Sequence, residues 1–362
     1  MLRSALARRG RGLLAGWLAG QARRRGIRIL RYHGVVERRM DPVLDRNQHT
    51  LASFVEQADY LARFRVLGLD ELLAELSRSG AAPSGRPAAA ITFDDGFANN
   101  LAAAEVLSRR RLPWMLFVPS GEIGAGPDSP RAMWLVTLSL WIMEARIARI
   151  EALGAAWPLS GREDRERAFR RIRSALKSLP ASDRRREMDA MESQLPAGET
   201  DRLVAAHPGL RMLDAAELRQ LAESGAEIGS HGVHHEMHNA AQPADVRARE
   251  LAESRAALEA LLGRPCRAFA FPNGDILRES PDEAARAGYA AAFTTEEASA
   301  TPGVRPHALP RISAPESLER FVRVFSWEET PSSRTPAAAD GPEQAPVVGR
   351  ALAPGAHGRK GA

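Results

Sequence analysis

The sequence predicts an α/β fold with parallel strands, interrupted by a helical insertion. Short apolar runs alternate with amphipathic segments before residue 121 and again after residue 210. This alternation is typical of strands that are joined by helices and lie parallel in one sheet. Between the two regions, residues 121–210 contain no convincing buried strand and carry apolar and charged segments with helical spacing instead.

The elements before the insertion follow from hydrophobic periodicity. Nearly continuous apolar runs predict buried strands at 27–36, 88–93 and 114–118. Apolar residues that recur every three or four positions predict helices at 51–61, 67–77 and 100–110.

The same patterns assign the rest of the chain. Within the insertion, we expect helices at 133–150, 162–177 and 183–195. The alternation then resumes, with strands expected at 227–230, 268–271 and 290–294. Helices are expected between them at 215–224, 244–262 and 280–287.

These patterns divide the chain into four parts. Residues 27–120 and 211–328 form the α/β domain, and residues 121–210 form the insertion. We interpret the insertion as a cap near the mouth of the domain, and a peripheral insertion is the alternative. Residues 329–362 are rich in Pro, Ala, Gly and Ser and are expected to be a disordered tail.

The N-terminal residues 1–26 are expected to form a basic helix. Arginines precede and follow a short apolar stretch at 13–19, which is far too short to span a bilayer. The pattern favours a cytoplasmic protein, or one that associates with a membrane surface through this basic segment. A poor signal peptide, and hence secretion, is the less favoured reading.

Composition excludes several classes of function. The net charge is only +5, nearly all cations are arginine, and no nucleic-acid-binding motif is present, so we expect no nucleic-acid partner. Cys266 is the single cysteine, which rules out a disulfide within the chain. We interpret it as a small buried residue rather than a catalytic thiol.

The run Asp94-Asp95-Gly96 is the most informative feature of the sequence. Two carboxylates follow the apolar strand expected at 88–93. Side chains alternate between the two faces of a strand, but a glycine at the strand end lets the backbone turn. Both carboxylates can then face one site.

A histidine cluster follows the strand expected at 227–230. His231 and His235 lie four residues apart, but so do His234 and His238. Spacing alone does not choose between the pairs, and His231 has the better claim because it directly follows the strand. Together with the two aspartates, such a pair predicts an oxygen- and nitrogen-ligated site for a divalent metal.

A third strand end lies at Phe271-Pro272-Asn273-Gly274. In α/β barrels, the carboxyl ends of the strands build the active site.

Taken in order, these three motifs resemble those of the polysaccharide deacetylases, the NodB-homology group or carbohydrate esterase family four. Tyr32-His33-Gly34 also resembles a first strand that recurs in bacterial members, and Leu309-Pro310-Arg311-Ile312 resembles their late strand. The resemblance covers roughly residues 27–120 and 211–325. It implies a distorted barrel of about seven β/α units.

The resemblance also implies roles for individual residues. Asp95, His231 and His235 would bind the metal, usually zinc, and Asp94 would be the general base. Arg267 matches the arginine that orients the base. The turn at Pro272 and Asn273 would contact the substrate, with a backbone N–H stabilising the oxyanion.

The general acid is where the sequence departs from the family pattern. Arg311 stands where many members have a histidine, and arginine does not release a proton at ordinary pH. His307 is our first candidate, and His33, His234 or Asp94 returning its proton are alternatives. Arg311 is then expected to hold a carboxylate or the substrate.

The function implied is a metal-dependent hydrolase acting on carbon–nitrogen bonds other than peptide bonds. Its substrate would be an acetamido sugar in a polysaccharide or lipid-linked glycan, from which it removes N-acetyl groups. The alternatives are a related O-deacetylase or other amide hydrolase, and a catalytically inactive glycan-binding module.

Overall fold

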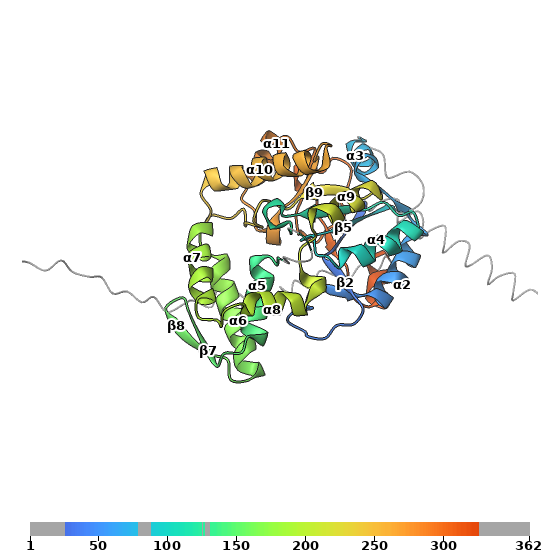
Figure 1. Ribbon diagram of the computed structural model, residues 1–362. Helices are drawn as coiled ribbons and strands as arrows, with labels where there is room; N and C mark the ends of the chain where they lie inside the picture. The colour runs from blue at the N-terminus through green and yellow to red at the C-terminus, as the bar shows by residue number, and fades with distance from the viewer. Residues whose placement is uncertain (1–25, 79–87, 125, 127–130, 326–362) are drawn as a thin grey trace, which may run out of the picture. The chain divides into compact units, whose positions relative to one another are not determined.

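The computed structural model describes residues 26–78, 88–124, 126 and 131–325 (Figure 1). The expected N-terminal helix and C-terminal tail therefore lie outside the described residues.

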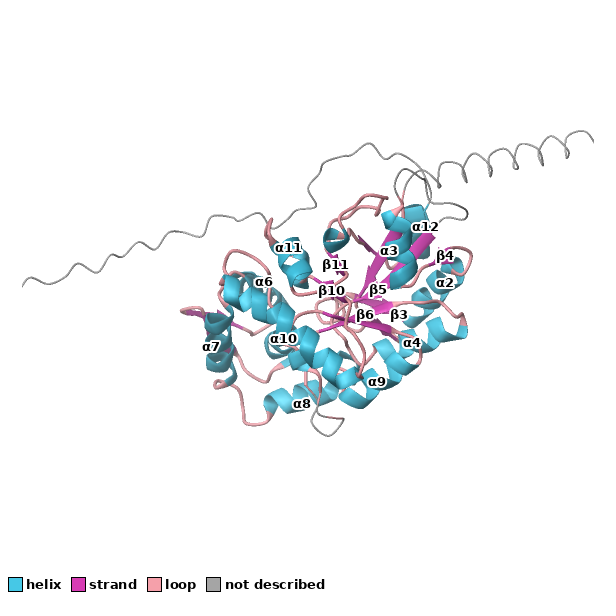
Figure 2. Ribbon diagram, turned by 90° about the horizontal axis from the view of Figure 1, so that it is seen from above, coloured by secondary structure: helices cyan, strands magenta, loops and turns pink. Residues whose placement is uncertain are grey.

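The centre of the fold is a curled parallel sheet with helices around it (Figure 2). Its strand order is β11-β10-β9-β6-β5-β1-β12, and the short β4 (Arg65–Val66) also pairs with β5. The bounds are β1 (Arg28–Tyr32), β5 (Ala88–Phe93), β6 (Met115–Val118), β9 (Glu227–Ser230), β10 (Ala268–Ala270), β11 (Ala291–Phe293) and β12 (Ile312–Ser313).

The sheet curls until its two ends meet. Leu309, three residues before β12, forms a parallel bridge with Phe293 of β11, and the Thr294 N–H donates to the Leu309 carbonyl at 2.8 Å. All neighbouring strands are parallel, so their carboxyl ends lie at one end of the barrel. The predicted α/β barrel class is confirmed.

Two apolar layers hold the sheet, because successive strand residues face opposite sides. In β6, Leu116 and Val118 belong to the outer core, which lies under the surrounding helices, whereas Met115 and Phe117 belong to the inner core.

The single cysteine, Cys266, is buried in the outer core, and burial raises the pKa of its thiol to about 12.

Most of the domain's helices lie where periodicity predicts them. They are α2 (Leu51–Leu61), α3 (Leu69–Ser77), α4 (Asn100–Arg109), α9 (Ala215–Glu223), α10 (Ala244–Leu262), α11 (Ser280–Arg286) and α12 (Leu318–Phe325). The strand expected at 27–36 is broken at His33 into β1 and β2 (Gly34–Val36), which pairs with β3 (Gln48–Thr50). No helix in the described part of the chain is long and apolar enough to cross a membrane.

The insertion forms a unit with its own core, drawn in green in Figure 1. Its helices are α5 (Trp134–Glu144), α6 (Arg162–Lys177), α7 (Ala181–Glu192) and α8 (Glu199–Ala206). The helix expected at 133–150 ends at Glu144, and an antiparallel hairpin follows, β7 (Arg149–Ala152) and β8 (Ala155–Pro158). Leu153 and Gly154 make its turn with positive φ values of 55° and 73°.

Candidate active site

The two adjacent aspartates turn into one site at the carboxyl end of β5. Asp94 continues the strand pairing, since its N–H donates to the Tyr32 carbonyl at 3.0 Å. Asp95 and Gly96 then take left-handed backbone conformations with φ of 75° and 70°. Such a conformation is uncommon outside glycine, and here it redirects the chain so that both buried carboxylates line the same pocket.

Asp94 forms a fully buried ion pair with Arg311. The guanidinium donates to both carboxylate oxygens, at 2.6 and 2.8 Å, and its Nε donates to the Thr294 carbonyl at 2.9 Å. Burial alone would raise the pKa of Asp94, but the positive charge of Arg311 and the bonds from its guanidinium outweigh burial, and the pKa of Asp94 falls to about 2. The expectation that Arg311 holds a carboxylate is confirmed, and the carboxylate is Asp94.

Arg267 does not contact Asp94, which corrects the role expected for it. It precedes β10, and its guanidinium pairs with Asp70 at 2.6 Å and with Glu227, the first residue of β9, at 3.6 Å. These positions are at the amino ends of the strands, whereas Asp94 follows the carboxyl end of β5. The orienting arginine comes instead from the late strand.

Asp95, His231 and His235 come together as a candidate metal centre. The Nε2 atoms of His231 and His235 lie 3.5 and 3.4 Å from Oδ1 of Asp95. One ligand atom from each residue lies within 4.8 Å of the others, and all three residues are buried. His231 donates its Nδ1–H to the Ala270 carbonyl at 2.7 Å, which leaves the Nε2 lone pair directed into the site.

The charge states of the cluster suit metal binding. Burial would raise the pKa of Asp95, but the facing imidazoles of His231 and His235 hold this pKa well below its usual value. Burial lowers the pKa of His235. An ionised carboxylate and a neutral imidazole are the forms that bind a cation.

Glu250 of α10 fixes the loop that carries the histidines. Its carboxylate accepts from the backbone N–H groups of Val233 and His234, at 2.7 and 3.1 Å. Gly232 has a φ of 84°, and a Cβ there would lie 2.5 Å from the Glu250 carboxylate. The glycine is therefore required by a close approach as well as by the turn.

The other two histidines of the cluster lie elsewhere. His234 pairs with Glu122 at 2.9 Å, and that bond raises the pKa of His234. His238 is buried against Phe269 and Phe271, and burial lowers the pKa of His238 to about 3. The geometry thus selects His231 and His235 from the two pairs that spacing left open.

His307 does not reach the site, which corrects its candidacy as the general acid. Its Nε2 lies 2.8 Å from the carbonyl of Tyr289, just before β11 and so at the amino end of the barrel. His33 lines the same pocket as Asp94 and Asp95. Burial lowers the pKa of His33, although the two aspartates oppose this shift.

The third motif forms one wall of the pocket. Pro272 and Asn273 lie in a short 3₁₀ turn after β10, and Asn273 has a φ of 58°. The amide oxygen of Asn273 accepts from Lys177, the last residue of α6, at 2.8 Å. Burial lowers the pKa of Lys177 to about 8. The insertion therefore contacts the barrel at its carboxyl end.

The pocket has a volume of about 180 Å³. Its lining includes residues that sequence reasoning missed: Arg31, Arg46, Asn47, Leu135 and Thr295. Arg31 had a signal, since it lies two positions before His33 and so faces the same side of the first strand. The others come from loops and from the insertion, where no local pattern marks a pocket.

The fold is an α/β barrel, and the buried acid–imidazole cluster lies at the carboxyl ends of its strands. Residues 198–292 match the family model described as polysaccharide deacetylase. This part of the chain is therefore similar to the polysaccharide deacetylases. A search of curated proteins found no match in sequence.

Solved structures share the fold. IcaB from Ammonifex degensii is 17% identical with a TM-score of 0.53, and the alignment covers 83% of this chain and 96% of that one. The Streptococcus pyogenes deacetylase PplD, solved in complex with acetate, is 17% identical with a TM-score of 0.53 and coverages of 83% and 99%. BC0361, a polysaccharide deacetylase from Bacillus cereus, is 15% identical with a TM-score of 0.50 and coverages of 83% and 69%.

Proposed function

We propose that this protein removes N-acetyl groups from acetamido sugars of a polysaccharide or lipid-linked glycan. The observation that carries the proposal is the cluster of Asp95, His231 and His235 beside an ionised Asp94. This arrangement supplies ligands for a cation and a separate carboxylate that does not have to bind it.

The donor set fits a divalent ion, and zinc best. Zinc in catalytic sites is held by three protein ligands drawn from histidine nitrogens and carboxylate oxygens, with a position left open. The three residues offer that set from two adjoining loops, with tautomer and charge already suitable. A bound ion would polarise the acyl carbonyl and lower the pKa of water at the site.

Asp94 is proposed as the general base. Arg311 occupies one lone pair on each of its oxygens and fixes the carboxylate plane, which leaves the remaining lone pairs for a water molecule. A carboxylate with a pKa of about 2 is a weak base, so it depends on water that is already acidified. Its value lies in being ionised and correctly oriented at any physiological pH.

His33 replaces His307 as the proposed acid. It lines the pocket with both aspartates, and their negative charges partly oppose the lowering of its pKa by burial. A histidine whose pKa is lowered by burial is a stronger acid when protonated, which suits donation to a departing amine. The turn at Pro272 and Asn273 is proposed to position the acyl oxygen.

The decisive experiment measures metal content and acetate release together. Purified protein is assayed on N-acetylated and O-acetylated glycans, with His231→Ala as the matched variant. We expect one equivalent of metal, acetate released from the N-acetylated glycan, and loss of both in the variant. Release only from O-acetyl esters would favour the esterase, and glycan binding without release would favour an inactive module.

A further inference from the structure

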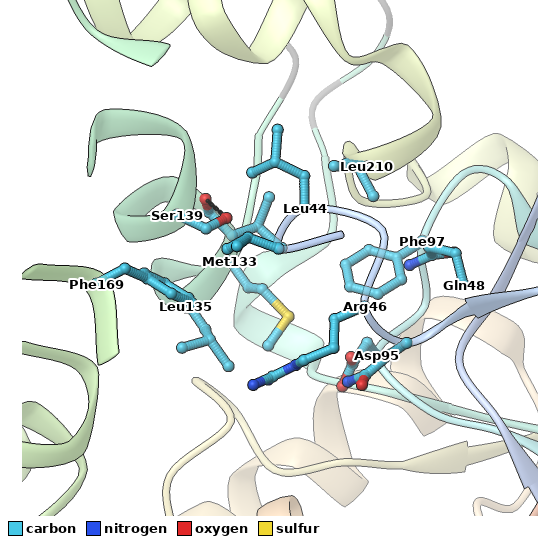
Figure 3. A pocket seen from close by; sticks show the side chains of 13 residues that line it. Leu44, Arg46, Gln48, Asp95, Phe97, Met133, Leu135, Ser139, Phe169 and Leu210 are labelled. Carbon is cyan, nitrogen blue, oxygen red and sulfur yellow. Dashed lines mark hydrogen bonds between the residues drawn. The ribbon is translucent and has the colours of Figure 1, made fainter. Parts of the chain in front are cut away.

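A second, apolar pocket opens beside the candidate metal centre (Figure 3). It lies between the loop before β3 and the helical insertion, and its volume is about 50 Å³. Apolar side chains form most of its wall: Val43, Leu44, Phe97, Met133, Leu135, Val136, Phe169 and Leu210.

This pocket and the polar pocket of the active site share one boundary. Asp95, Arg46, Asn47 and Leu135 line both of them. On the polar side stand Arg31, His33 and Thr295, with Asn273. On the apolar side, the polar residues other than the shared ones are Gln48 and Ser139. The Ser139 hydroxyl already donates to the Val136 carbonyl at 2.7 Å.

An amide substrate of the proposed reaction also has a polar side and an apolar side. Its carbonyl carbon must lie near Asp95, the sugar extends from the nitrogen, and the acyl chain extends from the carbon. A sugar matches a polar wall that offers hydrogen bonds, whereas an acyl chain gains from a dry apolar wall. The two pockets therefore match the two sides of the bond that breaks.

We propose that the apolar pocket binds the acyl side of the substrate and admits acyl groups longer than acetyl, up to about butyryl. This inference rests on the proposed function and deepens it, because it names the acyl class. Since a water-sized group needs roughly 10–15 Å³ of such volume, a pocket of about 50 Å³ holds a few carbons and excludes a long fatty chain. An acetyl methyl would leave most of it empty.

The proposed reaction is an ordinary hydrolysis of an amide. The carbon–nitrogen bond breaks, the water oxygen forms the new bond to the acyl carbon, and the amine departs with a proton. The products are a short carboxylate and a free amino sugar.

The test compares the preference for acyl chain length of the unaltered protein with that of a variant whose apolar pocket is filled. Ser139→Leu adds bulk inside the pocket, and Thr137→Leu adds similar bulk on the same helix without lining either pocket. The substrates are chitooligosaccharides carrying N-acetyl or N-butyryl groups. We expect the unaltered protein to cleave the butyryl amide within tenfold of the acetyl amide.

The variants then separate a binding pocket from a packing gap. Ser139→Leu should lower the butyryl-to-acetyl ratio of kcat/KM by about tenfold or more, since one methylene in a pocket changes discrimination by roughly 10–200-fold. Thr137→Leu should leave the ratio unchanged. A ratio that Ser139→Leu does not change, or butyryl cleavage more than about 100-fold slower in the unaltered protein, would overturn the inference.

Binding of acetate, propionate and butyrate to the zinc-supplemented protein provides a readout without turnover. Calorimetry should show affinity rising about threefold to fourfold for each added methylene, and Ser139→Leu should abolish the rise. If this gradient is present but no amide is cleaved, the proposed function fails and the pocket assignment stands. If the acetyl amide is cleaved and the gradient is flat, only the pocket assignment fails.

Discussion

At the scale of single residues, adjacent aspartates with the same sequence context have different surroundings. Asp94 contacts a guanidinium, and Asp95 contacts two imidazoles. We expect Asp94→Asn to retain bound metal but to lose about 10²–10⁴-fold in kcat, because only the base is removed. Asp95→Asn should lower metal content itself. Metal analysis with single-turnover kinetics checks both, and equal metal binding and rate in the two variants would contradict the assignment.

The Asp94–Arg311 pair predicts a pH dependence. The pKa of Asp94 is lowered from 3.8 to about 2, so its contribution to stability is present above about pH 3.8 and is lost as pH falls through about 2. Arg311→Met leaves a buried, unpaired carboxylate, whose pKa should rise. We expect the variant to lose about 3–5 kcal/mol of stability and the acid limb of its kcat/KM profile to move to higher pH.

Arg267→Met is the matched control, because Arg267 is half-exposed and pairs at the other end of the barrel. Its acid limb should coincide with that of the unaltered protein. A shift caused by Arg267→Met, with none from Arg311→Met, would restore the role that the sequence first suggested.

Two histidine variants test the assignment of the general acid. His33→Ala should lower kcat by about 10²-fold or more and remove the alkaline limb of the pH profile, since the proton donor to the amine is lost. His307→Ala should retain the activity of the unaltered protein, because its imidazole is held by the Tyr289 carbonyl. Full activity in His33→Ala would require another donor.

At the scale of elements, the insertion meets the barrel through Lys177 and Asn273. Lys177→Met and Asn273→Ala should each raise KM several-fold with a smaller effect on kcat, because the contact positions the pocket wall and touches neither aspartate. The free-energy cost of the double variant, taken from its KM, should be smaller than the sum of the costs of the two single variants, as expected for two partners of one bond. Strict additivity in that double-mutant cycle would show that the contact is not used.

The elements also show what could be predicted from the sequence. Asp94, Asp95 and His231 follow buried strands, and parallel strands bring such positions together, so local patterns located the site. Arg311 is assigned to Asp94 only by closure of the sheet through Leu309, which no local pattern encodes. The hairpin after Glu144 was missed because both strands are short: exposed and buried residues alternate in β7 over only four positions, and β8 is largely exposed.

At the scale of the whole molecule, the candidate metal centre joins segments far apart in sequence. Asp95 follows β5, whereas His231 and His235 follow β9, and the entire insertion lies between them in the chain. A ligand that binds only the folded state stabilises it by mass action, about 2.7 kcal/mol at a concentration 100 times Kd. For a domain of this size, we expect zinc to raise Tm by roughly 5 °C.

That shift should depend on the three ligands together. His231→Ala and His235→Ala should each abolish the response of Tm to zinc, and chelation should lower the Tm of the unaltered protein toward theirs. His238→Ala is the matched control, because its ring packs against Phe269 and Phe271 away from the cluster. It should lower Tm through lost packing while keeping the zinc response. A zinc response that survives in His231→Ala and His235→Ala would place the stabilising ion at some other site.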